Sequence, residues 1–214
     1  MLKFDVITLF PELFTPHLQN LPFRKGLEKK LIDIKLHNLR DYAVDKHGTV
    51  DDRPYGGGPG MILMVEPIVK ALEGINNSTV ILLSPRGEKF TQKKAEEYSK
   101  LDQITLICGR YEGVDARVEQ NFVDEVISIG DYVVSGGELP ALVVMESVVR
   151  LLPGILEKQE ATKQESFTNG QIEHPQYTRP ENFRNLTVPK VLLSGDHKKI
   201  EGWKEKNRKV HKNP

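Results

Sequence analysis

Short apolar runs alternate with amphipathic stretches along the first 150 residues, and this alternation predicts the fold class. The apolar runs have the length and the β-branched content of strands, and they lie at 4–10, 79–83, 104–108 and 122–127. The run 31–37 alternates with period two, which predicts a half-covered or edge strand. Helices are expected at 21–30, 64–73, 91–100 and 114–121. Strands and helices joined by short links predict an α/β fold, a parallel sheet with helices on both faces.

Three of the expected strands end in loops, after Leu83, Cys108 and Ile127. Ligands bind to parallel sheets at the carboxyl ends of the strands, so we expect these loops to share one pocket. The third loop, 128–140, reads SIGDYVVSGGELP and leads into an apolar run, 141–152, that we expect to be a buried helix. Alone it fits a glycine-capped connection as well as a ligand site, but its place beside the other two loops favours the ligand site.

A fourth loop, 51–61, reads DDRPYGGGPGM, and its glycines and prolines exclude regular structure. It lacks the Gly-Lys-Ser/Thr ending of a phosphate-binding Walker loop and the glycine spacing of a dinucleotide site. It is therefore a shaped loop that lines a site or a flexible linker. Pro54 and Pro59 favour the shaped loop because they stiffen the backbone.

The chain changes character after Pro153 and Gly154. The segment 155–176 is polar and without a clear period, which is typical of a linker, and Asp196 is expected to cap a last helix that contains Trp203. Seven basic and three acidic residues give the segment 196–214 a net charge of +4. This end is either a solvated helix or a phosphate-binding surface, and Trp203 fits a core position as well as a stacking position.

The amino-acid composition excludes several classes of protein and of site. The 214 residues carry 30 basic and 30 acidic side chains, which excludes a uniformly basic nucleic-acid coat but not a local basic patch. The single cysteine, Cys108, excludes an internal disulfide and a cysteine-ligated zinc site, and its apolar strand predicts a buried, inert thiol. Without a signal-peptide pattern or a long apolar run, we expect a cytoplasmic protein with no membrane partner.

Five runs of this sequence together match one family. They read DDRPYGGGPGM at 51–61, CGRYEGVD at 108–115, SIGDYVVSGGELP at 128–140, HPQYTRP at 174–180 and VLLSGDH at 191–197. From Met1 to about Trp203 the chain closely resembles the bacterial tRNA (guanine-N1)-methyltransferases, the TrmD family of SPOUT methyltransferases. The resemblance implies methyl transfer from S-adenosylmethionine to N1 of guanine 37, directly 3′ to the anticodon of tRNA.

The resemblance also implies an architecture. Residues 1–154 would form the α/β SPOUT domain, whose sheet is tied in a trefoil knot that binds the methyl donor. Residues 155–176 would be a flexible linker, and 177–214 a small helical tRNA-binding domain. That domain is expected to be short, because the chain ends soon after Trp203 where the family continues. The family is a homodimer with each active site at the subunit interface.

Methyl transfer to N1 needs a base for the N1 proton and a cation for the charge that builds on O6. The family's pair is a linker Asp and a helix Arg, which fall here on Glu165 and Arg150; the carboxylate is thus one methylene longer than in the family. Without the resemblance, Glu165 fits a solvated linker acid and Arg150 a surface ion pair. The resemblance further suggests Mg²⁺, whose ligands the sequence does not assign. Arg53, Arg179 and the terminal lysines are expected phosphate contacts.

The expected donor-binding residues come from the three strand-end loops. They are Leu82, Leu83, Ser84, Pro85, Gly109, Tyr111, Glu112, Ser128, Ile129, Gly130, Asp131, Tyr132, Val133, Val134, Gly136, Gly137 and Pro140. Backbone groups of Ile129, Tyr132 and Val134 are expected at the adenine edge, and the acidic side chains of Asp131 and Glu138 are expected to be structural. Two rival functions are a SPOUT ribose 2′-O-methyltransferase, which needs no linker carboxylate, and a non-catalytic RNA-binding module.

Overall fold

The computed structural model describes residues 1–156, 165–167 and 170–210 and divides into two compact units. The first unit is Met1–Glu157 and the second is Lys158–Pro214. The first unit contains all five strands of the one large sheet and the cavity described below. The two units are described separately.

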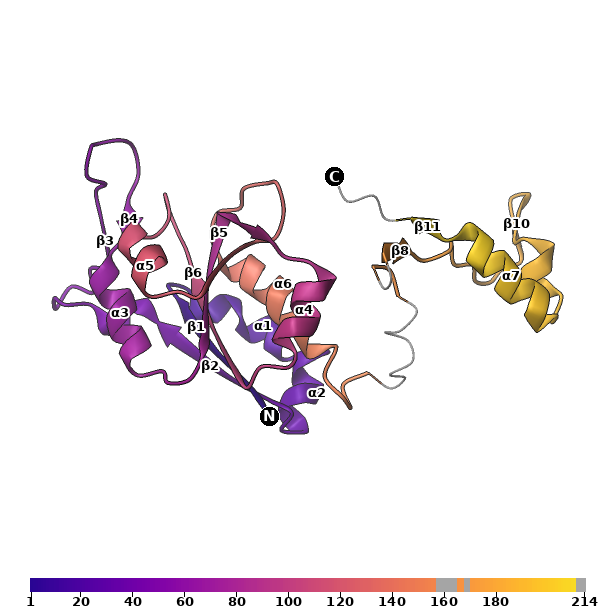
Figure 1. Ribbon diagram of the computed structural model, residues 1–214, viewed down its shortest axis with the longest axis horizontal. Coiled ribbons are helices and arrows are strands. Elements are labelled where there is room, and N and C mark those ends of the chain that lie inside the picture. Colours follow the sequence, from indigo (N-terminus) through magenta and orange to yellow (C-terminus); the bar gives the residue numbers. More distant parts are fainter. Residues whose placement is uncertain (157–164, 168–169, 211–214) are drawn as a thin grey trace. The chain divides into compact units, whose positions relative to one another are not determined.

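The first unit is built on a five-stranded parallel sheet with the order β2-β1-β6-β5-β7 (Figure 1). Its strands are β1 (Leu2–Thr8), β2 (Ile32–Asn38), β5 (Thr79–Lys89), β6 (Gln103–Cys108) and β7 (Glu125–Ser128). Each expected apolar run forms a strand, with boundaries shifted by a few residues. The period-two run forms β2, which lies at one edge of the sheet as predicted.

Helices cover both faces of this sheet, as the alternation predicts (Figure 1). Phe4 and Val6 of β1 pack into one apolar cluster, whereas Ile7 and the following Leu9 pack into the other. The first cluster includes residues of α2 (Phe23–Glu28), α4 (Gln92–Tyr98) and α6 (Glu138–Val149). The second includes residues of α3 (Val65–Glu73) and α5 (Ala116–Asn121). The short helices η1 (Pro11–Leu13), α1 (Thr15–Leu18) and η2 (Leu39–Tyr42) follow β1 and β2.

The prediction that the second apolar strand ends at Leu83 is wrong. Both Leu83 and Glu88 pair with Ile127 of β7, so the four residues between them leave the ladder and the strand then resumes. Gly87 passes so close to β7 that a Cβ there would lie 2.5 Å from the backbone of Ile127. The local breakers Pro85 and Gly87 therefore make a bulge within β5 instead of ending it.

The glycine-rich loop 53–61 is carried by a short antiparallel pair, β3 (Asp51–Asp52) and β4 (Ile62–Leu63). The backbone N–H of Leu63 donates to the carbonyl of Gly113 at 3.0 Å, and that of Glu112 donates to the carbonyl of Met61 at 3.0 Å. The base of the loop is thus fixed against the strand-end loop after β6. This arrangement favours the shaped loop over the flexible linker, at least for the base of the loop.

The second unit combines one longer helix with short strand pairs in the part that the structure describes. Its elements are β8 (Gln171–Ile172), β9 (Asn182–Phe183), β10 (Leu186–Thr187), η5 (Lys190–Leu193), α7 (His197–Asn207) and β11 (Lys209–Val210). Asp196 caps α7 as predicted, since its side chain accepts a hydrogen bond from the backbone of Lys199 at 3.1 Å. Trp203 packs edge-to-face on His174 and Tyr177. Ten of the 22 residues of the predicted linker, 157–164 and 168–169, lie outside the described residues.

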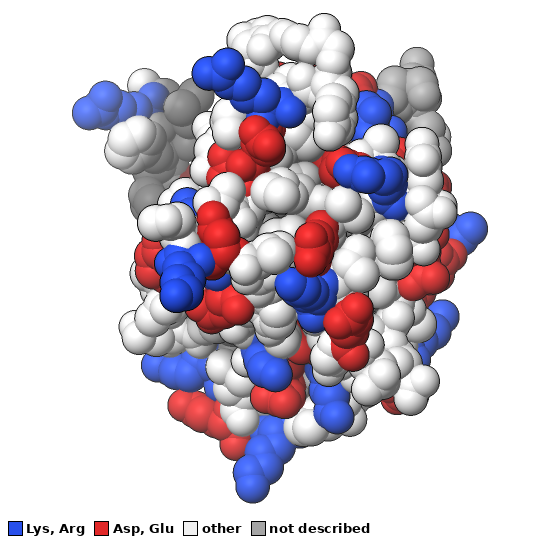
Figure 2. Space-filling view, turned by 90° about the vertical axis from the view of Figure 1, so that its left-hand side faces the viewer, with Lys and Arg blue, Asp and Glu red and all other residues white. Residues whose placement is uncertain are grey.

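Among the described residues of the face that carries α3 and α5, acidic and basic side chains are intermixed, with no continuous area of one sign (Figure 2). This agrees with the zero net charge of the sequence. Among the described helices, none has both the length and the apolar character needed to cross a membrane.

Candidate active site

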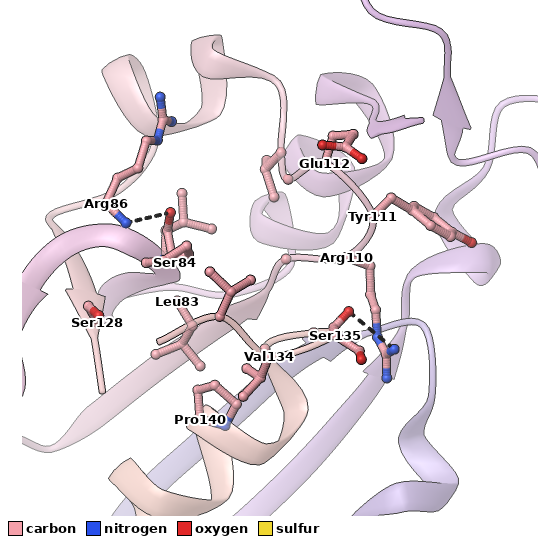
Figure 3. Close-up of a pocket in the computed structure, with 18 of the residues that line it drawn as sticks. Leu83, Ser84, Arg86, Arg110, Tyr111, Glu112, Ser128, Val134, Ser135 and Pro140 are labelled. Carbon is pink, nitrogen blue, oxygen red and sulfur yellow. Dashed lines mark hydrogen bonds between the residues drawn. The ribbon is translucent and has the colours of Figure 1, made fainter. Parts of the chain in front are cut away.

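A cavity of about 520 Å³ lies at the carboxyl ends of β6 and β7 and beside the bulge within β5 (Figure 3). Its walls come from the three loops that the sequence singles out: the bulge after Leu83, the loop after Cys108 and the loop after Ile127. The volume is within the usual range for small-molecule sites. The predicted convergence of the three loops is therefore confirmed.

Fifteen of the seventeen residues expected at the donor line this cavity. They are Leu82, Leu83, Ser84, Pro85, Gly109, Tyr111, Glu112, Ser128, Ile129, Tyr132, Val133, Val134, Gly136, Gly137 and Pro140. Gly130 and Asp131 lie outside the wall. Gly130 has φ +153° and turns the chain beneath the Tyr132 ring, and the Asp131 carboxylate accepts from Lys89 Nζ at 2.5 Å. These two residues shape the loop but do not face the cavity.

Several lining residues escaped the sequence analysis. They are Ile62, Arg86, Arg110, Gly113, Val114, Ala116, Ile127 and Ser135. Most are direct neighbours of predicted residues in the same loops, so that extending each loop by one or two positions would have found them. Ile62 is different because it reaches the cavity from β4, through the pairing of Leu63 with Val114. No local signal in the sequence indicates that pairing.

In the loop after β6, Tyr111 lies at the rim of the cavity and Glu112 contacts the glycine-rich loop 53–61. Tyr111 has φ +58°, a left-handed conformation that is uncommon for an aromatic residue, and it leaves its side chain half exposed at the rim (Figure 3). Next to it, Glu112 packs so closely on Gly60 that a Cβ there would lie 2.5 Å from the Glu112 side chain. Glycine at position 60 thus lets the glycine-rich loop 53–61 lie against the cavity rim.

Two glycines bring the turn 135–137 against the end of β6. The backbone N–H of Gly137 donates to the carbonyl of Gly109 at 2.8 Å, and Gly136 forms an antiparallel bridge with Arg110. A Cβ on Gly137 would lie 2.6 Å from Cα of Cys108, which real side chains do not tolerate. Glycine is required here because two backbone segments meet without room for a side chain.

A buried ion pair lies behind this turn. Glu138, the first residue of α6, is 1% exposed; it accepts from Nε of Arg110 at 2.9 Å and from the hydroxyl of Thr8 at 2.8 Å. The guanidinium also donates to the carbonyl of Ser135 at 3.4 Å (Figure 3) and lies over the ring of Phe10. A carboxylate is favoured at this position because it lies in the first turn of a helix. The structure agrees with the expected structural role of Glu138.

Cys108 lies at the end of β6, behind the same turn. It is 2% exposed, so the expectation of a buried cysteine is confirmed. Burial raises the pKa of its thiol well above the usual value, and the nearby Glu138 carboxylate adds to this rise. The thiol is therefore protonated and shielded, in agreement with an inert role.

The two residues expected to handle the proton and the developing charge lie in different units. Arg150 is the C-cap of α6 in the first unit, whereas Glu165 belongs to the second. Their pairing stays a prediction. Among the residues that the structure describes, no group of three His, Cys, Asp or Glu side chains is placed to hold a metal ion.

The sheet and its cavity define the class of this protein: a parallel α/β protein with a cavity of small-molecule size at one edge of its sheet, and with no Walker or dinucleotide loop in its sequence. The sequence profile of the family described as tRNA (Guanine-1)-methyltransferase TrmD matches residues 2–213. The chain therefore belongs to the TrmD family.

Individual relatives agree with this assignment. A tRNA (guanine-N(1)-)-methyltransferase of Carboxydothermus hydrogenoformans is 52% identical over 207 residues, which cover 96% of this chain and 82% of the relative. The enzyme of the same name from Dictyoglomus turgidum is 50% identical, covering 96% and 84%. That of Bacillus cereus is 47% identical, covering 96% and 86%. The recognition made from the five sequence runs is confirmed.

Proposed function

We propose that this chain is a tRNA (guanine-N1)-methyltransferase, which transfers a methyl group from S-adenosylmethionine to N1 of guanine 37. The observation that carries this proposal is membership of the TrmD family over nearly the whole chain, together with one cavity whose walls include two of the family runs, 108–115 and 128–140. Glycines 136 and 137 let the turn 135–137 pack directly against Arg110 and the end of β6, and this close packing shapes one wall of the cavity.

The chemistry of the cavity fits S-adenosylmethionine. Its apolar wall includes Leu83, Val134 and Pro140, which suit the faces of an adenine ring (Figure 3). Backbone groups of Ile129, Tyr132 and Val134 are proposed partners for the adenine edge. When bound, S-adenosylmethionine supplies an electrophilic methyl group on a sulfonium centre.

Two side chains of this protein are proposed to act on the guanine. Glu165 accepts the N1 proton as N1 forms its bond to the methyl carbon, and the electrons of the broken carbon–sulfur bond remain on sulfur. Arg150 donates hydrogen bonds to O6, where negative charge builds as the proton leaves. The extra methylene of Glu165, relative to the Asp of the family, is absorbed by the position of its backbone or of the bound ligand.

The proposal includes the assembly that the family implies. Residues 1–154 carry a knotted SPOUT domain, 155–176 the linker, and 177–214 the tRNA-binding domain. The protein acts in the cytoplasm as a homodimer. In the dimer, Glu165 of one subunit reaches the donor cavity of the other. Basic side chains, among them Arg53 and Arg179, contact tRNA phosphates, and Mg²⁺ assists without assigned ligands.

The test uses purified protein, labelled S-adenosylmethionine and tRNA transcripts with guanine or adenine at position 37. We expect label only on the guanine transcript, at N1 of the base after digestion. Label on a ribose 2′-oxygen would favour the ribose methyltransferase, and no label with intact tRNA binding would favour the non-catalytic module. Either result would overturn the proposal.

The role of the linker carboxylate has its own test. Glu165→Gln should abolish turnover while leaving binding of the donor unchanged, because the amide keeps the shape and cannot accept the N1 proton. Glu173→Gln, at a nearby acid of the same unit, is the matched control and should keep its activity. Full activity of Glu165→Gln would remove this residue from the role of base.

A further inference from the structure

We propose that Arg110 is a positioning residue for binding of the methyl donor, held in place by the buried Glu138. Arg110 supports donor binding by fixing the turn 135–137, which forms one wall of the cavity. This inference rests on the proposed function only in naming the ligand, S-adenosylmethionine. The contacts that carry it are independent of tRNA.

The guanidinium of Arg110 is held on several sides. Nε donates to the Glu138 carboxylate at 2.9 Å, and the planar group lies 4.5 Å from the ring centroid of Phe10. Thr8 donates to the other oxygen of Glu138 at 2.8 Å, which fixes the carboxylate itself. The side chain of Arg110 is 20% exposed and that of Glu138 is 1% exposed, so water competes little with this ion pair.

The turn 135–137 lies directly on this fixed group. Nη1 of Arg110 donates to the carbonyl of Ser135, and a Cβ on Gly136 would lie 2.2 Å from Nε. Ser135, Gly136 and Gly137 all line the cavity. Arg110 therefore acts as the surface on which this part of the wall rests.

A purely stabilising role would predict a different result. Glu138 sits at the start of α6, so losing the ion pair also weakens the fold, and a change in melting temperature alone does not separate the two roles. A positioning role predicts that the folded variant has a lower affinity for the donor. Once tRNA and donor are saturating, it turns over almost normally, because neither residue touches the reacting atoms.

The experiment compares Glu138→Gln, Arg110→Gln and Arg110→Lys with the wild-type protein. The control is Arg117→Gln, which breaks the more exposed Asp115–Arg117 ion pair outside the cavity wall. Calorimetric titration with S-adenosylhomocysteine gives Kd, steady-state assays give KM for S-adenosylmethionine and kcat, and thermal melts give the folded fraction. The amide of Glu138→Gln keeps the shape and a hydrogen-bond acceptor for Thr8, which favours folding of this variant.

Loss of a charge-assisted hydrogen bond corresponds to about 10- to 100-fold in an equilibrium constant. We expect Kd and KM to rise by that range for Arg110→Gln and Glu138→Gln. Arg110→Lys should be intermediate, because it keeps the charge without the planar fork. The kcat of each variant should stay within about threefold, and Arg117→Gln should bind as wild type.

Wild-type affinity in the folded Arg110→Gln or Glu138→Gln variant would overturn the inference, as would a fall in kcat with KM unchanged. The proposed function fails by a different result. If the wild-type protein binds S-adenosylhomocysteine but leaves guanine-37 tRNA unmethylated, the tRNA assignment fails, and the binding comparison still decides the role of Arg110.

Discussion

Gly137→Ala isolates the effect of a single methyl group at the contact between the turn 135–137 and β6. Gly137 has φ −77° and ψ −5°, a conformation that alanine adopts without strain. The added Cβ would nevertheless lie 2.6 Å from Cα of Cys108 and 2.9 Å from the backbone nitrogen of Gly109. Those atoms are backbone at the end of a central strand, so they cannot rotate away as a side chain would.

The magnitude follows from overpacking. One extra methyl group in a tightly packed site costs roughly 1–3 kcal/mol in the free energy of unfolding. For a unit of this size, about 1 kcal/mol corresponds to roughly 2–4 °C in melting temperature, so we expect a decrease of roughly 2–12 °C. The 2.8 Å hydrogen bond from Gly137 to Gly109 must lengthen as well, and donor affinity should fall with it.

Gly74→Ala is the matched control. Gly74 ends α3 with φ −83° and ψ −2°, nearly the conformation of Gly137, but its Cβ would meet only the carbonyl of Ala71 at 3.9 Å. Here alanine only restricts the unfolded chain, which stabilises by about 0.4–1 kcal/mol. Scanning calorimetry and donor titration of both variants decide the matter. If Gly137→Ala melts and binds like Gly74→Ala, the steric reasoning is refuted.

Two further predictions concern titratable groups. Cys108 should resist a thiol reagent at pH 8 in the native protein and react at once after denaturation, because burial raises its pKa and shields it; rapid native labelling would contradict this. The pKa of Asp115 is lowered, chiefly by the side-chain hydrogen bond from Arg117, so its stabilisation is present above the unfolded pKa and is lost as the pH falls through the folded pKa. Asp115→Asn should therefore melt below wild type at pH 7, with the difference shrinking toward pH 3; equal melting at pH 7 would argue against it.

Much of the first unit could be predicted because its signals are local. Apolar runs of strand length mark β1, β5, β6 and β7, and the period of two marks β2 as an edge strand. The boundaries of the elements are predicted less accurately than their presence. The last helix of this unit was expected from Ala141, whereas α6 begins at Glu138 and includes Pro140, which the first turn of a helix tolerates because its N–H needs no partner there.

The continuation of β5 past Leu83 could not be predicted from local sequence. Pro85 and Gly87 are breakers in isolation, but pairing of Glu88 and Lys89 with β7 supplies hydrogen bonds that propensity does not anticipate. Tertiary pairing thus decided where the strand ends.

The candidate site shows the same division between local and long-range information. Its glycine-rich loops were evident as loops, and parallel-sheet geometry indicated that they meet. The ion pair of Arg110 is not evident from the sequence, since its partner Glu138, and Thr8 that also binds Glu138, lie on other segments of the chain. Only the fold determines which side chain of the loop after β6 points toward α6 and which points toward the glycine-rich loop 53–61.

The hydrogen bond between Thr8 and Glu138 joins residues 130 positions apart in the sequence. It forms only after α6, the last helix of the first unit, has been synthesised and has left the ribosome. A nascent chain that stops before α6 has all five strands of the sheet but lacks the anchor of the turn 135–137. During synthesis, we therefore expect a ligand-binding cavity to form late and abruptly, when α6 docks, instead of growing with each added strand.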